Sequence, residues 1–148
     1  MSTIRKVTID NDELAREFLE DACVLGIQTT MEAHRFIWMI NRHFRIDLRY
    51  QPDAEIVLPK RTKSFLFPYY LFNEPNTELQ HIMYVNKHDG EYLLPELKHF
   101  DFLWMLKTEN DKTSLLAGIM SELRNLEQVQ VVAELAGDKI KHKQNLIV

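Results

Sequence analysis

The chain has 148 residues, of which 45% are hydrophobic and 27% are charged. This length suits one domain with one core, and the composition is that of an ordinary globular protein. The formal net charge of −4 weighs against a general polyanion binder, and the single cysteine, Cys23, excludes an intrachain disulfide or a zinc site of several cysteines. With no leader-like or long apolar run, we expect a cytoplasmic protein without a membrane partner.

The first third of the chain predicts short elements and then a main helix. Residues 4–9 alternate loosely, as in a short strand, and residues 10–29 pass from a helical or turn pattern into a strand. The helix is predicted over about 29–44, because Thr29 and Glu32 have the spacing of a capping box. Its apolar stripe is Ala33, Phe36, Ile37, Ile40 and Phe44.

The middle of the chain is rich in strand and turn signals. Residues 47–63 are expected as a connection in which Pro52 and Pro59 interrupt regular structure, with room for a short strand at 55–58. Pro68 interrupts the aromatic run 65–72, and a proline inside a strand indicates an edge or a bulge. A strand is expected over residues 80–87.

A hairpin, a short turn and another strand are expected next. Asp89 and Gly90 have hairpin-turn chemistry, and Pro95 can open a single helical turn because its missing N–H is harmless there. A strand is expected over residues 101–107. One face of that strand carries Phe102, Trp104 and Leu106.

The last third predicts a second main helix, a strand and a tail. The helix is expected over 113–126, capped by Asp111 and Thr113. The strand that follows is predicted to bury Val129, Val131, Ala133 and Leu135 on one face. In the tail, residues 137–148, the final apolar side chains can dock on a partner or on the domain, and the tail is otherwise expected to be mobile.

This order of elements predicts one α+β domain over residues 1–148. A two-layer sandwich of a mostly antiparallel sheet and two main helices fits it. A split βαβ arrangement is one version, but the additional strand near Trp104 means that a plain ferredoxin-like count does not fit.

The most informative segment is 94–102, Leu-Pro-Glu-Leu-Lys-His-Phe-Asp-Phe. It resembles the signature of the bacterial IPExxxVDY family, which is named after its own motif. Pro95, Glu96 and Asp101 match the motif at its spacing, and Leu94, Phe100 and Phe102 replace Ile, Val and Tyr. Because the family is uncharacterised, the resemblance implies no activity, substrate or cofactor. If the family's tyrosine hydroxyl has a chemical role, Phe102 has lost it.

Glu96 and Asp101 have two interpretations. As a carboxylate pair they suit acid–base chemistry or the binding of a metal. As structural residues they satisfy backbone N–H groups, Glu96 at the start of a helical turn and Asp101 at its end, and this is the interpretation we favour. The nearby His81, His88 and His99 have no metal-motif spacing, so neither a metal nor a cofactor is predicted.

Lys60, Arg61 and Lys63 precede a run of aromatic residues. Basic and aromatic side chains together can bind single-stranded nucleic acid. The alternative is a solvated loop before a core strand, which we favour because no RNA-binding signature accompanies the cluster.

The absence of a catalytic motif favours a non-enzymatic protein-interaction module that self-associates, most simply as a homodimer. One alternative is a small enzyme or ligand-binding protein that uses Glu96 and Asp101. The other is a weak binder of single-stranded nucleic acid through Lys60, Arg61 and Lys63.

Overall fold

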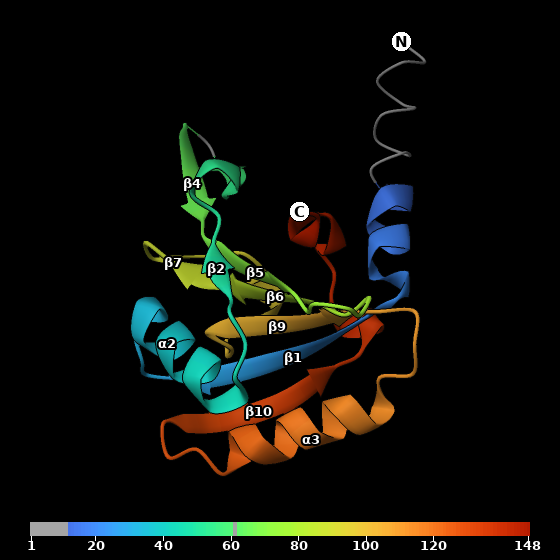
Figure 1. The fold of residues 1–148 in the computed structure, drawn as a ribbon. Helices are drawn as coiled ribbons and strands as arrows, with labels where there is room; N and C mark the ends of the chain where they lie inside the picture. Colours follow the sequence, from blue (N-terminus) through green and yellow to red (C-terminus); the bar gives the residue numbers. More distant parts are fainter. Residues whose placement is uncertain (1–11, 61) are drawn as a thin grey trace.

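A computed structural model describes residues 12–60 and 62–148 and has the expected α+β fold (Figure 1). Its main sheet has six strands in the order β10-β1-β9-β6-β5-β2, and all neighbours are antiparallel. These strands are β1 (Ala22–Thr29), β2 (Arg49–Tyr50), β5 (Tyr69–Asn73), β6 (Gln80–Val85), β9 (Phe102–Lys107) and β10 (Val129–Leu135). The two main helices are α2 (Ala33–Phe44) and α3 (Thr113–Arg124).

Smaller elements complete the described chain. Residues 12–20 are helical, and we call them helix 12–20. Two hairpins stand apart from the main sheet: β3 (Ile56–Lys60) with β4 (Lys63–Phe67), and β7 (Lys87–His88) with β8 (Glu91–Tyr92). Single helical turns occur at Pro52–Ala54, Pro95–Leu97, Gly137–Lys139 and Lys143–Leu146. The strand predicted over residues 4–9 lies outside the described residues.

Four of the strands and the two main helices form a ferredoxin-like core. The chain order β1-α2-β6-β9-α3-β10 combines with the spatial order β10-β1-β9-β6, so each strand–helix–strand unit is split by an inserted strand. The sheet does exceed a plain ferredoxin-like count, as predicted. The prediction named the wrong strand, however. Trp104 lies on the central strand β9, and the additional strands are β5 and β2, which come from the long segment between α2 and β6.

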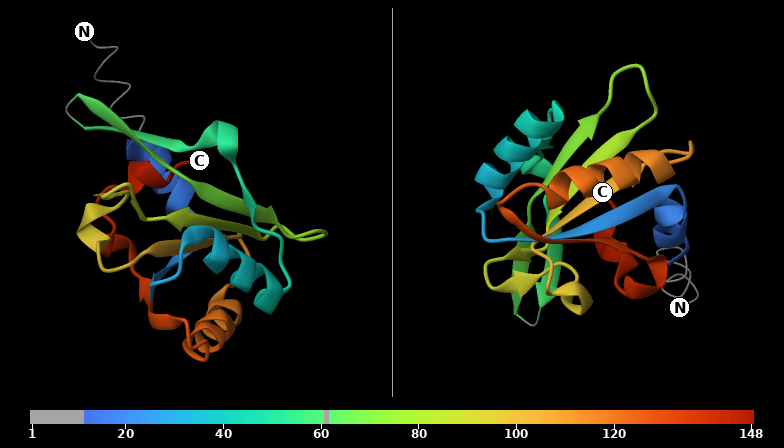
Figure 2. Two further views of the ribbon diagram at one scale, coloured as in Figure 1. Left: turned by 90° about the vertical axis from the view of Figure 1, so that its left-hand side faces the viewer. Right: turned by 90° about the horizontal axis from the view of Figure 1, so that it is seen from below.

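Both faces of the sheet are covered. Figures 1 and 2 show α2 and α3 on one face, and helix 12–20, the β3–β4 hairpin and the C-terminal segment (residues 137–148) on the other. Strand β9 is buried on both sides, with Phe102, Trp104 and Leu106 in the helix-side core and Leu103 and Met105 in the opposite core. None of the helices in the described ranges is long and apolar enough to cross a membrane.

The start of the first main helix differs from the prediction. Thr29 is the last residue of β1, and its hydroxyl donates to the Gln128 carbonyl at 2.6 Å instead of capping a helix. Helix α2 begins at Ala33, and Glu32 occupies its N-cap position without a side-chain hydrogen bond. Long-range strand pairing therefore outweighs the local capping signal. The helix ends at Phe44, as predicted.

Proline positions explain two further differences. Pro59 lies inside β3 opposite Ser64 and does not break it, because an outer strand tolerates a missing N–H. Pro68 separates β4 from β5, so the chain changes sheet there. Strand β5 itself is not an edge strand, since it lies between β6 and β2.

Strand β10 does not alternate as predicted. Val131 is 44% exposed, whereas its neighbour Val132 is buried in the core on the α3 side. The strand lies at the edge of the sheet, so its second face is only partly covered. The hairpin turn is confirmed, with positive φ at Asp89 and Gly90, and so is the helical turn at Pro95.

Candidate functional site

The motif segment (residues 94–102) is organised by one buried side chain, Asn86, which is 0% exposed. Its Nδ2 donates to the carbonyls of Leu97 (3.0 Å) and Phe100 (2.8 Å), and its Oδ1 accepts from the Leu94 N–H at 2.8 Å. The Asn86 backbone N–H donates to the Asp101 carbonyl at 2.9 Å. One amide thus binds backbone groups along the whole turn. The Leu94 N–H and the Phe100 carbonyl would otherwise lack a partner, whereas the Leu97 carbonyl also accepts from the Phe100 N–H at 3.1 Å.

The aromatic residues of the motif segment pack on the sheet and α2. The Phe100 ring lies so close to Gly26 of β1 that an added Cβ would fall 2.6 Å from the ring. Phe102 is buried and stacks on Phe36 of α2, with ring centroids 4.3 Å apart. Phe102 therefore occupies an apolar core position.

Glu96 binds the C-terminal segment. One carboxylate oxygen accepts from the backbone N–H groups of Lys141 (2.8 Å) and His142 (2.9 Å), and the other contacts Nδ1 of the His142 ring at 2.7 Å. Desolvation acts to raise the pKa of Glu96, but these hydrogen bonds to the ionised form outweigh it, and the pKa lies below its ordinary value. Glu96 therefore fastens the C-terminal segment to the motif segment.

Asp101 binds a different part of the chain. Its Oδ2 accepts from the Thr29 N–H at 3.0 Å, and its own N–H donates to the Ile27 carbonyl at 2.8 Å. The structural interpretation expected both carboxylates to satisfy amides of the local turn. Both do accept backbone N–H groups, but those donors are distant in sequence. Glu96 and Asp101 hold separate segments and do not converge on a common point.

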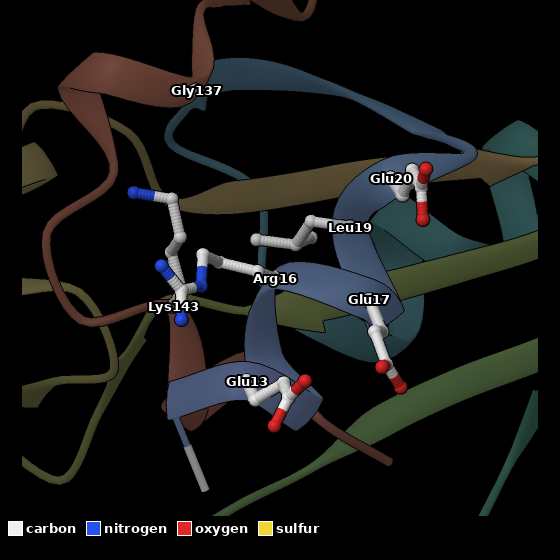
Figure 3. A pocket seen from close by; sticks show the side chains of 7 residues that line it. All are labelled: Glu13, Arg16, Glu17, Leu19, Glu20, Gly137 and Lys143. Carbon is white, nitrogen blue, oxygen red and sulfur yellow. The ribbon is translucent and has the colours of Figure 1, made fainter. Parts of the chain in front are cut away.

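A hollow of about 500 Å³ lies where helix 12–20 meets the C-terminal segment (Figure 3). Figure 3 shows Arg16 extending toward Lys143, while the carboxylates of Glu13 and Glu20 point elsewhere. The residues that line the hollow are Glu13, Arg16, Glu17, Leu19, Glu20, Gly137 and Lys143.

The basic cluster on the β3–β4 hairpin is partly neutralised. Lys60 Nζ lies 2.6 Å from the Glu91 carboxylate. Lys63 lines a hollow of about 560 Å³ beside Phe65, and Arg61 lies outside the described residues. The aromatic run that follows is mostly committed to packing, because Phe67 and Tyr69 are buried.

The three histidines of the hairpin region do not meet. His81 is buried on β6, the His88 ring contacts the Leu66 carbonyl at 2.8 Å, and His99 lies exposed in the motif segment. Across residues 12–60 and 62–148 no three His, Cys, Asp or Glu side chains are placed to hold a metal ion. Cys23 is partly buried on β1, and burial raises the pKa of its thiol.

His81 is nevertheless unusual among buried residues. Trp104 Nε1–H donates to its Nδ1 at 3.2 Å, so the hydrogen of the neutral ring lies on Nε2. That atom lies 3.5 Å from the Glu74 carboxylate, without hydrogen-bond geometry. Burial lowers the pKa of His81, although Glu74 acts in the opposite direction. This side chain thus belongs to the core as a neutral ring.

The outer face of α2 carries an exposed tryptophan. Trp38 is 63% exposed, the highest value among the large hydrophobic side chains described. The guanidinium of Arg42 lies 5.2 Å from the centre of its ring. Phe36, Ile37 and Ile40 of the same helix are buried, so Trp38 faces away from the core.

Sequence reasoning missed several of these roles. Asn86 carried a weak signal, a lone amide between an apolar strand and a hairpin. Trp38 carried a stronger one, since it lies outside the apolar stripe of its helix. The proximity of Arg16 to Lys143 had no local signal, because 127 positions separate the two residues (143 − 16).

Comparison of the chain with models of protein families finds no matching family, and comparison with curated proteins finds no matching sequence.

Proposed function

We propose that the protein is a non-enzymatic interaction module that binds an acidic surface of another protein through the outer face of α2. The observation that carries this proposal is Trp38, a tryptophan 63% exposed on the face opposite the core. Tryptophan and arginine are the residues most enriched among energetically dominant interface positions. A large apolar ring on a solvent-facing helix gains free energy when a partner covers it.

The charges around Trp38 define the partner. Arg35 and Arg42 lie three residues before and four residues after it, so all three share one helical face. Arg45 follows at the end of the helix. The nearby Asp47 already pairs with Arg49 at 2.7 Å. This region is therefore basic in a chain of net charge −4, which favours an acidic partner through electrostatic complementarity.

The alternatives have weaker support. An enzyme that uses Glu96 and Asp101 needs both carboxylates at one point, whereas each binds a different segment. A nucleic-acid surface at Lys60, Arg61 and Lys63 needs available positive charge, whereas Lys60 pairs with Glu91. Membership of the IPExxxVDY family, location in the cytoplasm and homodimer formation stay predictions.

The experiment is an affinity capture from the native cells, with and without nuclease, using the parent protein, Trp38→Ala and Leu66→Ala. Leu66 is the control because it is also exposed, at 47%, but lies on the β3–β4 hairpin. We expect an acidic protein in the parent and Leu66→Ala lanes only. The purified partner should then bind Trp38→Ala at least about ten-fold more weakly than the parent, or about 1.4 kcal/mol.

Three results separate the competing functions. Equal affinity of the parent and Trp38→Ala for the captured protein contradicts the proposal. Capture that nuclease abolishes favours the nucleic-acid alternative. Sedimentation that finds a dimer of the parent and a monomer of Trp38→Ala makes a second copy of the chain the partner.

A further inference from the structure

We propose that the hollow between helix 12–20 and the C-terminal segment binds a small organic anion, whose phosphate or carboxylate group lies between Arg16 and Lys143 (Figure 3). This site lies on the sheet face opposite α2 and is independent of the function proposed above.

The orientation of Arg16 is the first observation. Glu13 and Glu20 lie three residues before and four residues after it, which are the positions that commonly pair on a helix. Their carboxylates nevertheless point away, and Arg16 extends toward another cation, Lys143 (Figure 3). No ion pair among the described residues involves Arg16.

The C-terminal segment holds the opposing cation in place. Lys143 Nζ donates to the Ile140 carbonyl at 2.6 Å, which leaves its other N–H donors for a ligand. Arg16 and Lys143 also line an adjoining hollow of about 260 Å³, where Lys141 adds a third cation and Asp12 one carboxylate. The backbone of Lys141 is fixed by Glu96 at 2.8 Å. The motif carboxylate therefore positions the segment that supplies two of the three cations.

The lining defines the ligand class. Neighbouring cations repel one another, and an anion between them removes that repulsion. The planar guanidinium of arginine matches the geometry of phosphate and carboxylate groups. Leu19 adds an apolar wall, and about 500 Å³ is within the usual range for small-molecule sites. Glu13, Glu17 and Glu20 line the same hollow and disfavour polyanions, so the ligand has one anionic group and an uncharged remainder.

The test is a calorimetric titration of the full chain at low salt with phenyl phosphate, benzoate, inorganic phosphate and phenol. We expect phenyl phosphate or benzoate to bind, and which one does identifies the anionic group. Inorganic phosphate should bind more weakly, since it lacks an apolar part for Leu19, and phenol should not bind. Arg16→Gln and Lys143→Gln should each weaken binding at least ten-fold, whereas Glu17→Gln should strengthen it.

Lys139→Gln is the matched control, because Lys139 lies on the same segment but does not line either hollow. Circular dichroism should show each variant folded, and Arg16→Gln decides the result if Lys143→Gln does not fold. The proposal is overturned if neither aromatic anion binds the parent. It is also overturned if Arg16→Gln binds as tightly as the parent, or if Lys139→Gln loses as much affinity as Arg16→Gln.

Discussion

Asn86 is the single residue on which the geometry of the motif segment depends most. It is completely buried, and its side chain forms three hydrogen bonds to the backbone of residues 94–100. Because the side chain is fully buried, its truncation removes the partner of backbone donors and acceptors that lie away from solvent. A buried amide of this kind contributes by defining one conformation of the turn.

Asn86→Ala should lower the free energy of unfolding by about 3 kcal/mol, because it leaves the Leu94 N–H and the Phe100 carbonyl without a partner. The Leu97 carbonyl keeps only its bond from the Phe100 N–H. Urea denaturation followed by tryptophan fluorescence measures the change. Asn110→Ala is the control, since Asn110 is exposed and should change stability by no more than about 0.5 kcal/mol. Similar stability of the two variants would show that the Asn86 hydrogen bonds contribute little.

At the scale of the element, β1 and the motif segment pack closely because Gly26 of β1 has no side chain. Gly26 lies mid-strand between β10 and β9, where glycine is normally unfavourable. Its role here is space, because the Phe100 ring occupies the volume that a Cβ would need. The ring has little freedom to move, since the Phe100 carbonyl is held by Asn86 at 2.8 Å.

Gly26→Ala should destabilise the protein by about 1–3 kcal/mol, the usual cost of overpacking a core. The same change made on a Phe100→Val background should cost clearly less, because the smaller side chain leaves room for the Cβ. Thermal unfolding of the parent, the two single variants and the double variant gives the coupling free energy between positions 26 and 100. A cost that is independent of residue 100 would exclude the clash as its cause.

Gly118→Ala is the control for this cycle. Gly118 lies in α3 with nothing within 4 Å of an added Cβ. Alanine there should stabilise the protein by up to about 1 kcal/mol through helix propensity alone. Substitution by alanine is therefore expected to lower stability at Gly26 and to raise it at Gly118. The same residue type has opposite effects at the two positions because the packing around them differs.

Elements with strong local signals could be predicted from the sequence. Helix α3, the Asp89–Gly90 turn and the Pro95 turn all depend on signals between residues close together in the chain, and all three elements are present. The predicted start of α2 was wrong because the Thr29 hydroxyl binds the carbonyl of Gln128, a residue far along the chain, and does not cap the helix. Local spacing carries no information about such a partner.

At the scale of the whole molecule, the same limit applies to the site. The sequence singled out Glu96 and Asp101 and favoured backbone capping, but it could not show which amides they bind. Those donors belong to β1 and to the C-terminal segment, which folding alone brings to the motif segment. The cations of the proposed anion site come together for the same reason, since Glu96 fastens Lys141 and His142 near helix 12–20.

The pH dependence of stability tests whether Glu96 holds the C-terminal segment against the motif segment. Hydrogen bonds hold its pKa below the ordinary value of 4.5, so the folded state favours the ionised carboxylate. Its contribution is therefore complete at neutral pH and is lost as the pH falls through the folded-state pKa. Glu96→Ala should cost about 2–3 kcal/mol at pH 7, and its difference from the parent should shrink below about pH 4.

Hydrogen exchange locates the effect in the chain. In Glu96→Ala the amides of Lys141 and His142 should exchange much faster than in the parent, while those of β9 stay protected, because the C-terminal segment opens locally. Glu122→Ala is the control: its carboxylate contacts His43 at 2.8 Å on an exposed surface and should contribute no more than about 1 kcal/mol. If Glu96→Ala matches the parent in stability and in hydrogen exchange at pH 7, the carboxylate is not needed to hold the C-terminal segment in place. A direct role of Glu96 in binding a ligand or partner would then be the better explanation of its position.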